Sequence, residues 1–173
     1  MTSSGRRGAK RPRPKRGKPV NKSRARLSLI VEEKSWASDP RAISLIRRAV
    51  RAALPKSTHG AVTILLSGDA RLKELNSLFR GKPKSTNVLS FPADDAKYLG
   101  DVAIAYGATA REARGQGKAF AAHAAHLAVH GVLHLLGYDH ENDRDAKIME
   151  AHEARILARL GLPDPYARVR EAA

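Results

Sequence analysis

The sequence predicts an α+β domain in which a mixed β-sheet of about four strands packs against helices. Two observations lead to this class. Segments with the alternating apolar pattern of strands and segments with the apolar spacing of helices follow one another along the chain, which is typical of layered folds. The connection from Phe91 to Gly100 is too short for a crossover helix, so we expect one pair of strands to be antiparallel.

The N-terminal half is expected to hold two strands and two helices. Asp39 and Pro40 favour the start of a helix, because Asp is a good N-cap and Pro suits the first helical position. Apolar residues recur at helical spacing up to Leu54, and Pro55 then ends the helix. The expected elements are a strand at 27–31, a helix at 40–54, a strand at 62–66 and, after a turn at 67–69, a helix to about residue 79.

The C-terminal half continues the alternation. Pro92 is expected to close a short β segment, Gly137 to end a helix rich in Ala, His and Leu, and Asp143 to cap the last helix. The expected elements are a β segment at 86–91, a strand at 100–106, a helical segment from about 108 that glycines break at 115 and 117, a helix at 119–136 and a last helix from 143 to about 160.

The net charge of +15 lies mostly at the N-terminus. Residues 1–26 hold eleven Lys or Arg and no acidic residue, whereas the other 147 residues hold 21 basic and 17 acidic residues, a net of only +4. We expect residues 1–24 to be a disordered basic tail, residues 25–165 to form one domain and residues 166–173 to be a flexible C-terminus. The tail suits contact with RNA or the ribosome; a solvated extension that only aids solubility is the alternative.

Cysteine is absent, which excludes a disulfide framework, a thiolate metal site and a cysteine nucleophile. The tail lacks the apolar region of a secretory signal, and no apolar run approaches the roughly 20 residues of a membrane helix. We therefore expect a cytoplasmic protein without a membrane partner, in which any metal is bound by nitrogen and oxygen.

Three histidines, His130, His134 and His140, have the spacing of a metal site. Four residues advance a helix by about 40° beyond one full turn, so the first two project from one face. Gly137 ends the helix and lets the chain return with His140. Three neutral imidazoles on one Zn²⁺ leave a fourth position for water, which is the arrangement of catalytic and not of structural zinc. We expect one zinc ion per chain.

The remaining histidines receive ordinary roles. His126 lies four residues before His130, but histidines at 126, 130 and 134 span about 12 Å along a straight helix and cannot converge on one ion. We interpret His126 as a packing residue or one that orients a ligand. His59 lies in a turn, and His152 lies on the inward stripe of the last helix.

The histidine spacing matches that of three-histidine zinc proteases except at one position. In those enzymes the residue after the first histidine is a glutamate that acts as general base. Here that residue is Gly131, so a protease is disfavoured.

Three stretches of the chain carry a resemblance to a known family. The first reads HGVLHLLGYDH at 130–140; the second combines LN at 75–76, FRGK at 79–82 and STNVLSFP at 85–92; the third is LGDV at 99–102. In order and spacing, across about residues 60–161, they resemble the YbeY family of bacterial rRNA maturation endoribonucleases. The resemblance implies an α+β fold, three histidines on one zinc, and a metal-dependent hydrolase of single-stranded RNA. It also implies action in small-subunit rRNA 3′-end processing and ribosome quality control, with partners on the small ribosomal subunit and no DNA substrate.

Residues outside the histidines are also expected to take part. The family's functional arginine falls on Arg80, so catalysis is assigned to Arg80 and, through the metal, to His130. Arg80 is expected to bind an RNA phosphate; without the resemblance, an ordinary surface arginine at the end of a helix would be the preferred interpretation. Lys82 and Lys84 are expected to attract RNA by their positive charge. Asp139 and Asp101 are each expected to accept a proton or to orient a metal-bound histidine. Pro83 stands where the family's pattern leads us to expect an acidic residue, and we expect this departure to affect the loop beside Arg80 and not the metal site.

Two other functions stay open at this point. One is a ribosome-assembly factor that binds RNA and carries a structural zinc; the other is a different zinc hydrolase. Unfolding on removal of zinc would favour a structural role, whereas loss of activity with the fold intact would favour catalysis.

Overall fold

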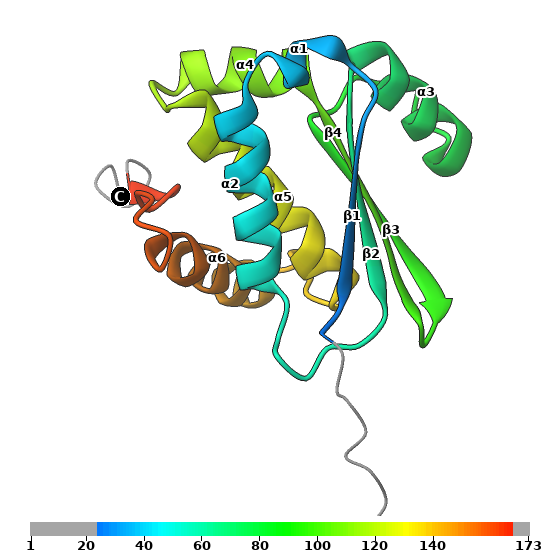
Figure 1. The fold of residues 1–173 in the computed structure, drawn as a ribbon, viewed down its shortest axis with the longest axis vertical. Helices are drawn as coiled ribbons and strands as arrows, with labels where there is room; N and C mark the ends of the chain where they lie inside the picture. The colour runs from blue at the N-terminus through cyan, green and yellow to red at the C-terminus, as the bar shows by residue number, and fades with distance from the viewer. Residues whose placement is uncertain (1–23, 168–173) are drawn as a thin grey trace, which may run out of the picture.

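The computed structural model describes residues 24–167, which form a four-stranded β-sheet with helices packed on it (Figure 1). In their order across the sheet, the strands are β1 (Arg26–Val31), β2 (Ala61–Ser67), β4 (Tyr98–Ala105) and β3 (Val88–Asp95). Strands β1 and β4 run parallel to β2, whereas β3 is antiparallel to β4. The predicted mixed sheet of an α+β domain is confirmed. Apart from Arg24, Tyr166 and Ala167, the predicted tail and flexible C-terminus lie outside the described residues.

Six helices occur within residues 24–167. They are α1 (Lys34–Ala37), α2 (Pro40–Ala53), α3 (Asp69–Arg80), α4 (Tyr106–Gly115), α5 (Phe120–Leu135) and α6 (Asp143–Ala158). The short α1 was not predicted. As predicted, Asp39 caps α2 by accepting a hydrogen bond from the Ala42 N–H. Asp143 was predicted to cap α6, but the cap is Asn142, whose Oδ1 accepts from the Asp145 N–H at 2.9 Å. Asp143 instead lies in the first turn of α6, where a negative charge complements the helix dipole.

The end of β3 corrects a second boundary. Pro92 was predicted to close this strand, but β3 continues to Asp95 and turns back into β4 at Tyr98. Proline is tolerated here because β3 is an edge strand, where the backbone groups along the outer edge have no neighbouring strand to pair with. Opposite Pro92 stands Gly100, where a Cβ atom would lie 2.2 Å from the Phe91 carbonyl oxygen. The close approach of the two strands therefore requires glycine at this position.

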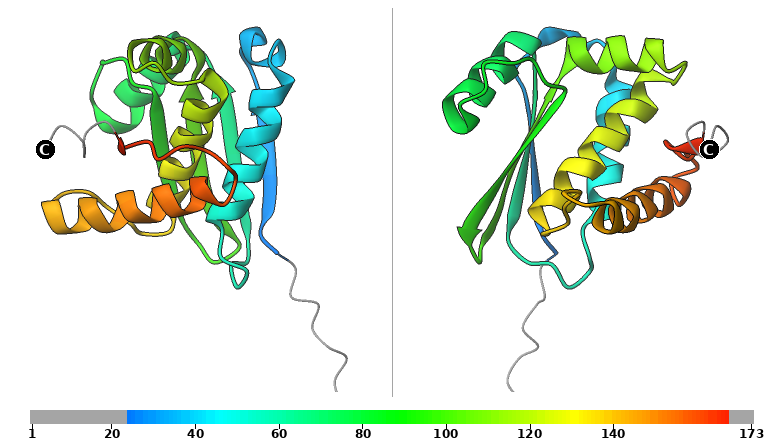
Figure 2. Two further views of the ribbon diagram at one scale, coloured as in Figure 1. Left: turned by 90° about the vertical axis from the view of Figure 1, so that its left-hand side faces the viewer. Right: turned by 180° about the vertical axis from the view of Figure 1, so that it is seen from behind.

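Helices α2 and α5 cover one face of the sheet, and α3 lies on the other side near one end (Figures 1 and 2). The larger core lies between α5, α2, α6 and the first face; its sheet residues include Val62, Ile64, Leu66, Val102 and Ile104. Since side chains alternate along a strand, the intervening residues of β3 and β4 point to the α3 side. None of the helices within residues 24–167 has the length and apolar character needed to cross a membrane. The central position of α5 places its last two turns between the sheet and α6.

Candidate metal centre and active site

Three histidine side chains meet where α5 ends. His130 and His134 lie one turn apart on α5, and His140 follows in the loop before α6. The metal-binding atoms that the three rings offer all lie within 4.8 Å of one another. His130 and His134 are half-buried and His140 is exposed. The structure therefore brings together the three residues predicted as metal ligands, in a group that is open to solvent on one side.

The chain returns toward α5 through a C-terminal capping motif. The Gly137 N–H donates to the His134 carbonyl, and the Tyr138 N–H donates to the Leu133 carbonyl, both at 3.0 Å. These are the two bonds of a Schellman motif, which requires a left-handed residue at its turn. Gly137 supplies it with a φ of 91°. The turn directs the following residues, including His140, back over the face that carries His130 and His134.

Two of the imidazole rings are oriented by partners on their Nδ1 atoms. His134 Nδ1 lies 2.9 Å from the Tyr138 carbonyl oxygen, which can only accept, so this nitrogen carries the hydrogen. His130 Nδ1 lies 2.7 Å from Glu153 Oε1, an ionised carboxylate that also only accepts. In their neutral forms both rings therefore expose an unprotonated Nε2. These two Nε2 atoms face each other at 3.1 Å, where two lone pairs need a cation between or beside them.

This arrangement fits a bound metal ion. Two nitrogens about 2.0–2.1 Å from one tetrahedral ion lie about 3.4 Å apart, close to the observed Nε2 separation. Burial lowers the pKa of His134, and the neighbouring His130 and His140 lower it further. A lowered pKa favours the neutral imidazole, which is the form that binds metals.

Glu153, on α6, is a residue that the sequence analysis did not single out. It is fully buried, and its two oxygens bind both His130 and His126: Oε1 lies 2.7 Å from His130 Nδ1, and Oε2 lies 2.7 Å from His126 Nε2. The Tyr166 hydroxyl also donates to Oε2. Burial alone would raise the pKa of Glu153, but the hydrogen bonds from His126 and His130 lower it to about 2. The carboxylate is therefore ionised, and it orients His130 from behind.

The two aspartates predicted for this orienting role lie elsewhere. Asp139 is exposed beside the histidines, and its Oδ1 accepts from the backbone N–H of His140 at 2.7 Å. The structure does not bring Asp101 to the histidines. Its neighbours Gly100 and Val102 face α5, so its own side chain points to the opposite side of the sheet, where it accepts from the Tyr98 hydroxyl.

Arg80 lines the same cleft as the three histidines. The cleft has a volume of about 530 Å³ and is lined by Arg80, Asn87, Ser90, Pro92, His130, His134, Asp139 and His140, among others. Arg80 is the last residue of α3, and its Nη2 donates to the Ser90 carbonyl at 3.0 Å. This bond holds the guanidinium at the cleft and leaves its other N–H groups available. Lys82 and Lys84 are exposed on the following loop and do not line the cleft.

Polar residues of β3 and the preceding loop brace this cleft. Ser90 Oγ donates to the Gly131 carbonyl at 3.1 Å, which joins β3 to α5. Asn87 Nδ2 donates to the Glu112 carboxylate on α4, and Glu112 in turn lies 2.8 Å from the buried His123 Nε2. His123 thus serves an internal network, separate from the metal-binding group.

Gly131 explains why a protease-like glutamate has no place beside His130. A Cβ atom at this position would lie 2.4 Å from Val102 Cγ1, because α5 packs closely on β4 there. Any larger side chain would have to displace the strand. The residue that distinguishes this chain from three-histidine proteases is therefore required by the packing of the fold.

Comparisons with known proteins agree with this geometry. A family model described as Endoribonuclease YbeY matches residues 30–161. A protein of Maricaulis maris named Endoribonuclease YbeY is 48% identical over 145 residues, which cover 81% of this chain and 91% of that protein. One of the same name from Bradyrhizobium diazoefficiens is 48% identical over 153 residues, covering 80% and 84%. The solution structure of a Thermotoga maritima protein shares the fold, with a TM-score of 0.52 and 22% identity over 78% of this chain and 91% of that one.

Proposed function

Because this chain belongs to the YbeY family of endoribonucleases and is therefore a hydrolase that acts on RNA, we propose that it is a zinc-dependent, single-strand-specific enzyme of small-subunit rRNA 3′-end maturation and ribosome quality control. The observation that carries this proposal is the separation of 3.1 Å between the Nε2 atoms of His130 and His134, in a cleft that Arg80 also lines. A site for a metal cation and a guanidinium that line the same cleft could both bind the negatively charged phosphate of a phosphodiester.

The metal would be held by His130, His134 and His140. An all-nitrogen set of three imidazoles with one side open to solvent is typical of catalytic zinc. When bound, zinc supplies Lewis-acid activation of water or of a phosphate oxygen. The chain's contribution is to hold the three rings in place, with His130 braced by Glu153 and His134 by the Tyr138 carbonyl.

Arg80 would bind the scissile phosphate. Its Nη2 already donates to the Ser90 carbonyl. Because the side chain is fixed in this way before RNA binds, binding costs little additional side-chain entropy. The remaining N–H groups would stabilise the charge that develops on the phosphate during cleavage. Lys82 and Lys84, on the neighbouring loop, would raise the local concentration of RNA by their field.

Proton transfer has one candidate in the cleft besides the metal site itself. Asp139 is exposed there and uses Oδ1 for the His140 backbone, which leaves Oδ2 available. Glu153 is excluded from this role because it is buried and both of its oxygens are occupied. In this proposal the substrate is ribosomal RNA of the small subunit, so the enzyme would act in the cytoplasm. Its partners would include proteins of the small ribosomal subunit.

The decisive experiment is cleavage of single-stranded, 3′-extended small-subunit rRNA by purified protein as isolated, after chelation and after return of zinc. The same preparation of Arg80→Ala serves as the control for contaminating nucleases. Loss on chelation, recovery with zinc and inactivity of the variant are expected. Equal cleavage in all samples would refute the proposal, as would recovery with magnesium but not with zinc.

A further inference from the structure

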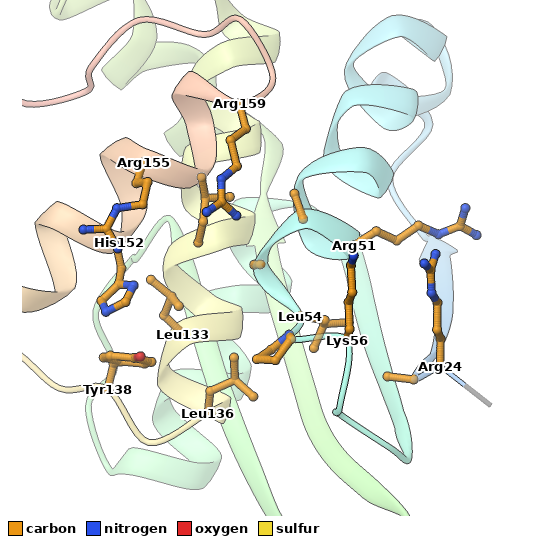
Figure 3. A pocket seen from close by; sticks show the side chains of 15 residues that line it. Arg24, Arg51, Leu54, Lys56, Leu133, Leu136, Tyr138, His152, Arg155 and Arg159 are labelled. Carbon is orange, nitrogen blue, oxygen red and sulfur yellow. The ribbon is translucent and has the colours of Figure 1, made fainter. Parts of the chain in front are cut away.

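A second, strongly basic pocket lies between α2 and α6 (Figure 3). Its volume is about 730 Å³, and five of its lining residues are cations: Arg24, Arg51, Lys56, Arg155 and Arg159. No aspartate or glutamate lines it. The pocket therefore concentrates positive charge in a domain whose remaining basic and acidic residues nearly balance.

The five cations form two rims. Figure 3 shows Arg155 of α6 and Arg159, which follows α6, on one side. On the other side it shows Arg24, which precedes β1, Arg51 of α2 and Lys56, which follows α2. Within residues 24–167 none of the five side chains takes part in an ion pair or hydrogen bond. Unpaired positive charges on both sides of one pocket repel, and a polyanion bound between them would relieve that repulsion.

The floor of the pocket is apolar and carries an aromatic pair. Leu54, Leu133 and Leu136 lie between the two rims (Figure 3). At one end the Tyr138 and His152 rings meet with centroids 4.8 Å apart. Phosphate-binding cations beside aromatic rings and apolar surface are the combination that binds single-stranded nucleic acids, because the rings stack on bases while the cations bind the backbone.

Tyr138 connects this pocket to the metal centre. It lines both the basic pocket and the histidine cleft, and its carbonyl accepts from the metal-binding ring of His134. A strand with one phosphate between Arg80 and the histidines would pass Tyr138 to reach the basic rims. The two sites therefore lie along one path for an extended polyanion.

We propose that this pocket is a second RNA-binding site, which holds backbone phosphates of the same single strand whose scissile phosphate lies at the metal centre. The inference rests on the proposed function, since it takes the substrate to be RNA. Residues 1–23, which join the domain at Arg24 on the rim, carry nine basic and no acidic residues. Their positive charge makes them unsuited to fill a basic pocket and would attract the same RNA.

The test measures binding of fluorescent 2′-O-methyl RNA to the full-length, zinc-loaded chain by anisotropy, as a function of salt. A trinucleotide, too short to occupy both sites at once, is compared with a dodecanucleotide. Arg155→Gln/Arg159→Gln should weaken binding of the longer RNA roughly tenfold near physiological salt and reduce the salt slope by about 1.4, the loss of two phosphate contacts on a single strand. Binding of the trinucleotide should not change.

Two further variants make the result specific. Arg51→Gln/Lys56→Gln, on the opposite rim, should reproduce the loss even if the α6 variant folds poorly. Lys73→Gln/Arg114→Gln removes the same charge from exposed positions outside both pockets and should have little effect on either RNA.

Equal losses in the rim and control variants would overturn the inference, because binding would then depend on net charge alone. Unchanged affinity of the rim variants for the longer RNA would also overturn the inference. If those variants also failed to cosediment with small ribosomal subunits, the pocket would be assigned to binding a protein. Metal-dependent cleavage of a short RNA by the unaltered chain tests the proposed function separately, so the two ideas can fail independently.

Discussion

Glu153 on α6 and His130 on α5 meet inside the domain, with Glu153 Oε1 2.7 Å from His130 Nδ1. The same carboxylate binds His126 and Tyr166 through its other oxygen. His130 is thereby held with Nε2 toward His134 and His140. A carboxylate behind a metal-binding imidazole fixes its tautomer and increases its basicity. The metal centre therefore depends on the packing of α6 against α5.

Replacing Glu153 with Gln should weaken metal binding by about 10–100-fold, the usual cost of losing such a carboxylate. Glutamine keeps the size of the side chain but removes its charge, and it cannot accept from both His126 and His130 as well as from Tyr166. The affinity is measured by competition with a chromophoric zinc chelator.

Glu150→Gln is the matched control, since Glu150 lies one turn earlier on α6 and makes no hydrogen bond to the histidines. It should bind zinc as the unaltered chain does. Retention of full zinc affinity by Glu153→Gln would show that packing alone orients His130.

Replacing His134 with Ala should abolish stoichiometric zinc binding, because two imidazoles cannot supply the three ligands of the site. Zinc should then raise the melting temperature of the unaltered chain but not that of the variant. At a free zinc concentration 100 times the Kd, binding stabilises a protein by about 2.7 kcal/mol. His59→Ala, a histidine far from this group in the sequence, should keep the zinc-dependent shift. A normal shift in His134→Ala would remove this residue from the ligand set.

Replacing Arg80 with Ala should leave zinc content and folding intact but lower cleavage by about 10²–10³-fold, as loss of one transition-state donor does. Arg80→Lys should recover only part of the activity, because lysine keeps the charge without the bidentate fork. Single-turnover cleavage of single-stranded RNA measures the effect, with Lys73→Ala on the same helix as the control. Unimpaired cleavage by Arg80→Ala would return this arginine to an ordinary surface role.

Local patterns were enough to predict the sheet and the histidine group. His130 and His134 share a helix face by spacing, and Gly137 marks the turn that returns His140, so no tertiary information is needed. The antiparallel pair of β3 and β4 followed from the length of their connection. Pro92 misled the prediction because local rules do not reveal that β3 lies at the edge of the sheet.

Features that depend on contacts between distant segments could not be predicted in the same way. Glu153 meets His130 only because α6 packs on α5, although an acidic residue on the apolar stripe between Met149 and Ile156 was a usable signal. Asp101 was expected to accept a proton or to orient a metal-bound histidine, yet the alternation of β4 turns it to the far face of the sheet. The cations of the basic pocket come from three separate segments, just before β1, at the end of α2 and at the end of α6, so no single motif marks it.

Replacing Gly131 with Ala should destabilise the domain by about 1–3 kcal/mol, the usual cost of overpacking a core. The added methyl group would lie 2.4 Å from Val102 Cγ1 and 3.2 Å from Ser90 Oγ, so α5 must move away from the sheet. Urea denaturation measures the free energy of unfolding. Gly115→Ala, in α4, meets nothing within 4 Å and should instead be neutral or stabilise by up to about 1 kcal/mol. Equal effects of the two substitutions would contradict the close contact between α5 and β4.

Asp69 should make stability depend on pH in the acid range. Its carboxylate on α3 accepts from the Ala108 N–H at 2.8 Å and from Arg111 at 2.6 Å, and so caps α4, whose own N-cap residue offers no side-chain bond. Burial alone would raise the pKa of Asp69, but the bonds from Arg111 and Ala108 lower it below its ordinary 3.8. The ionised form is therefore favoured by folding. Its contribution is present above pH 3.8 and is lost as the pH falls through the lower, folded-state value.

Asp69→Asn should accordingly cost about 1 kcal/mol at pH 7, the typical value of a lost cap, and the difference from the unaltered chain should shrink as the pH falls below 3.8. Free energies of unfolding in urea between pH 7 and pH 2.5 measure both quantities. Asp94→Asn, at an exposed aspartate without a side-chain hydrogen bond in the described part of the chain, controls for net charge. A penalty for Asp69→Asn that persists at low pH would mean that the cap depends on the shape of the side chain and not on its charge.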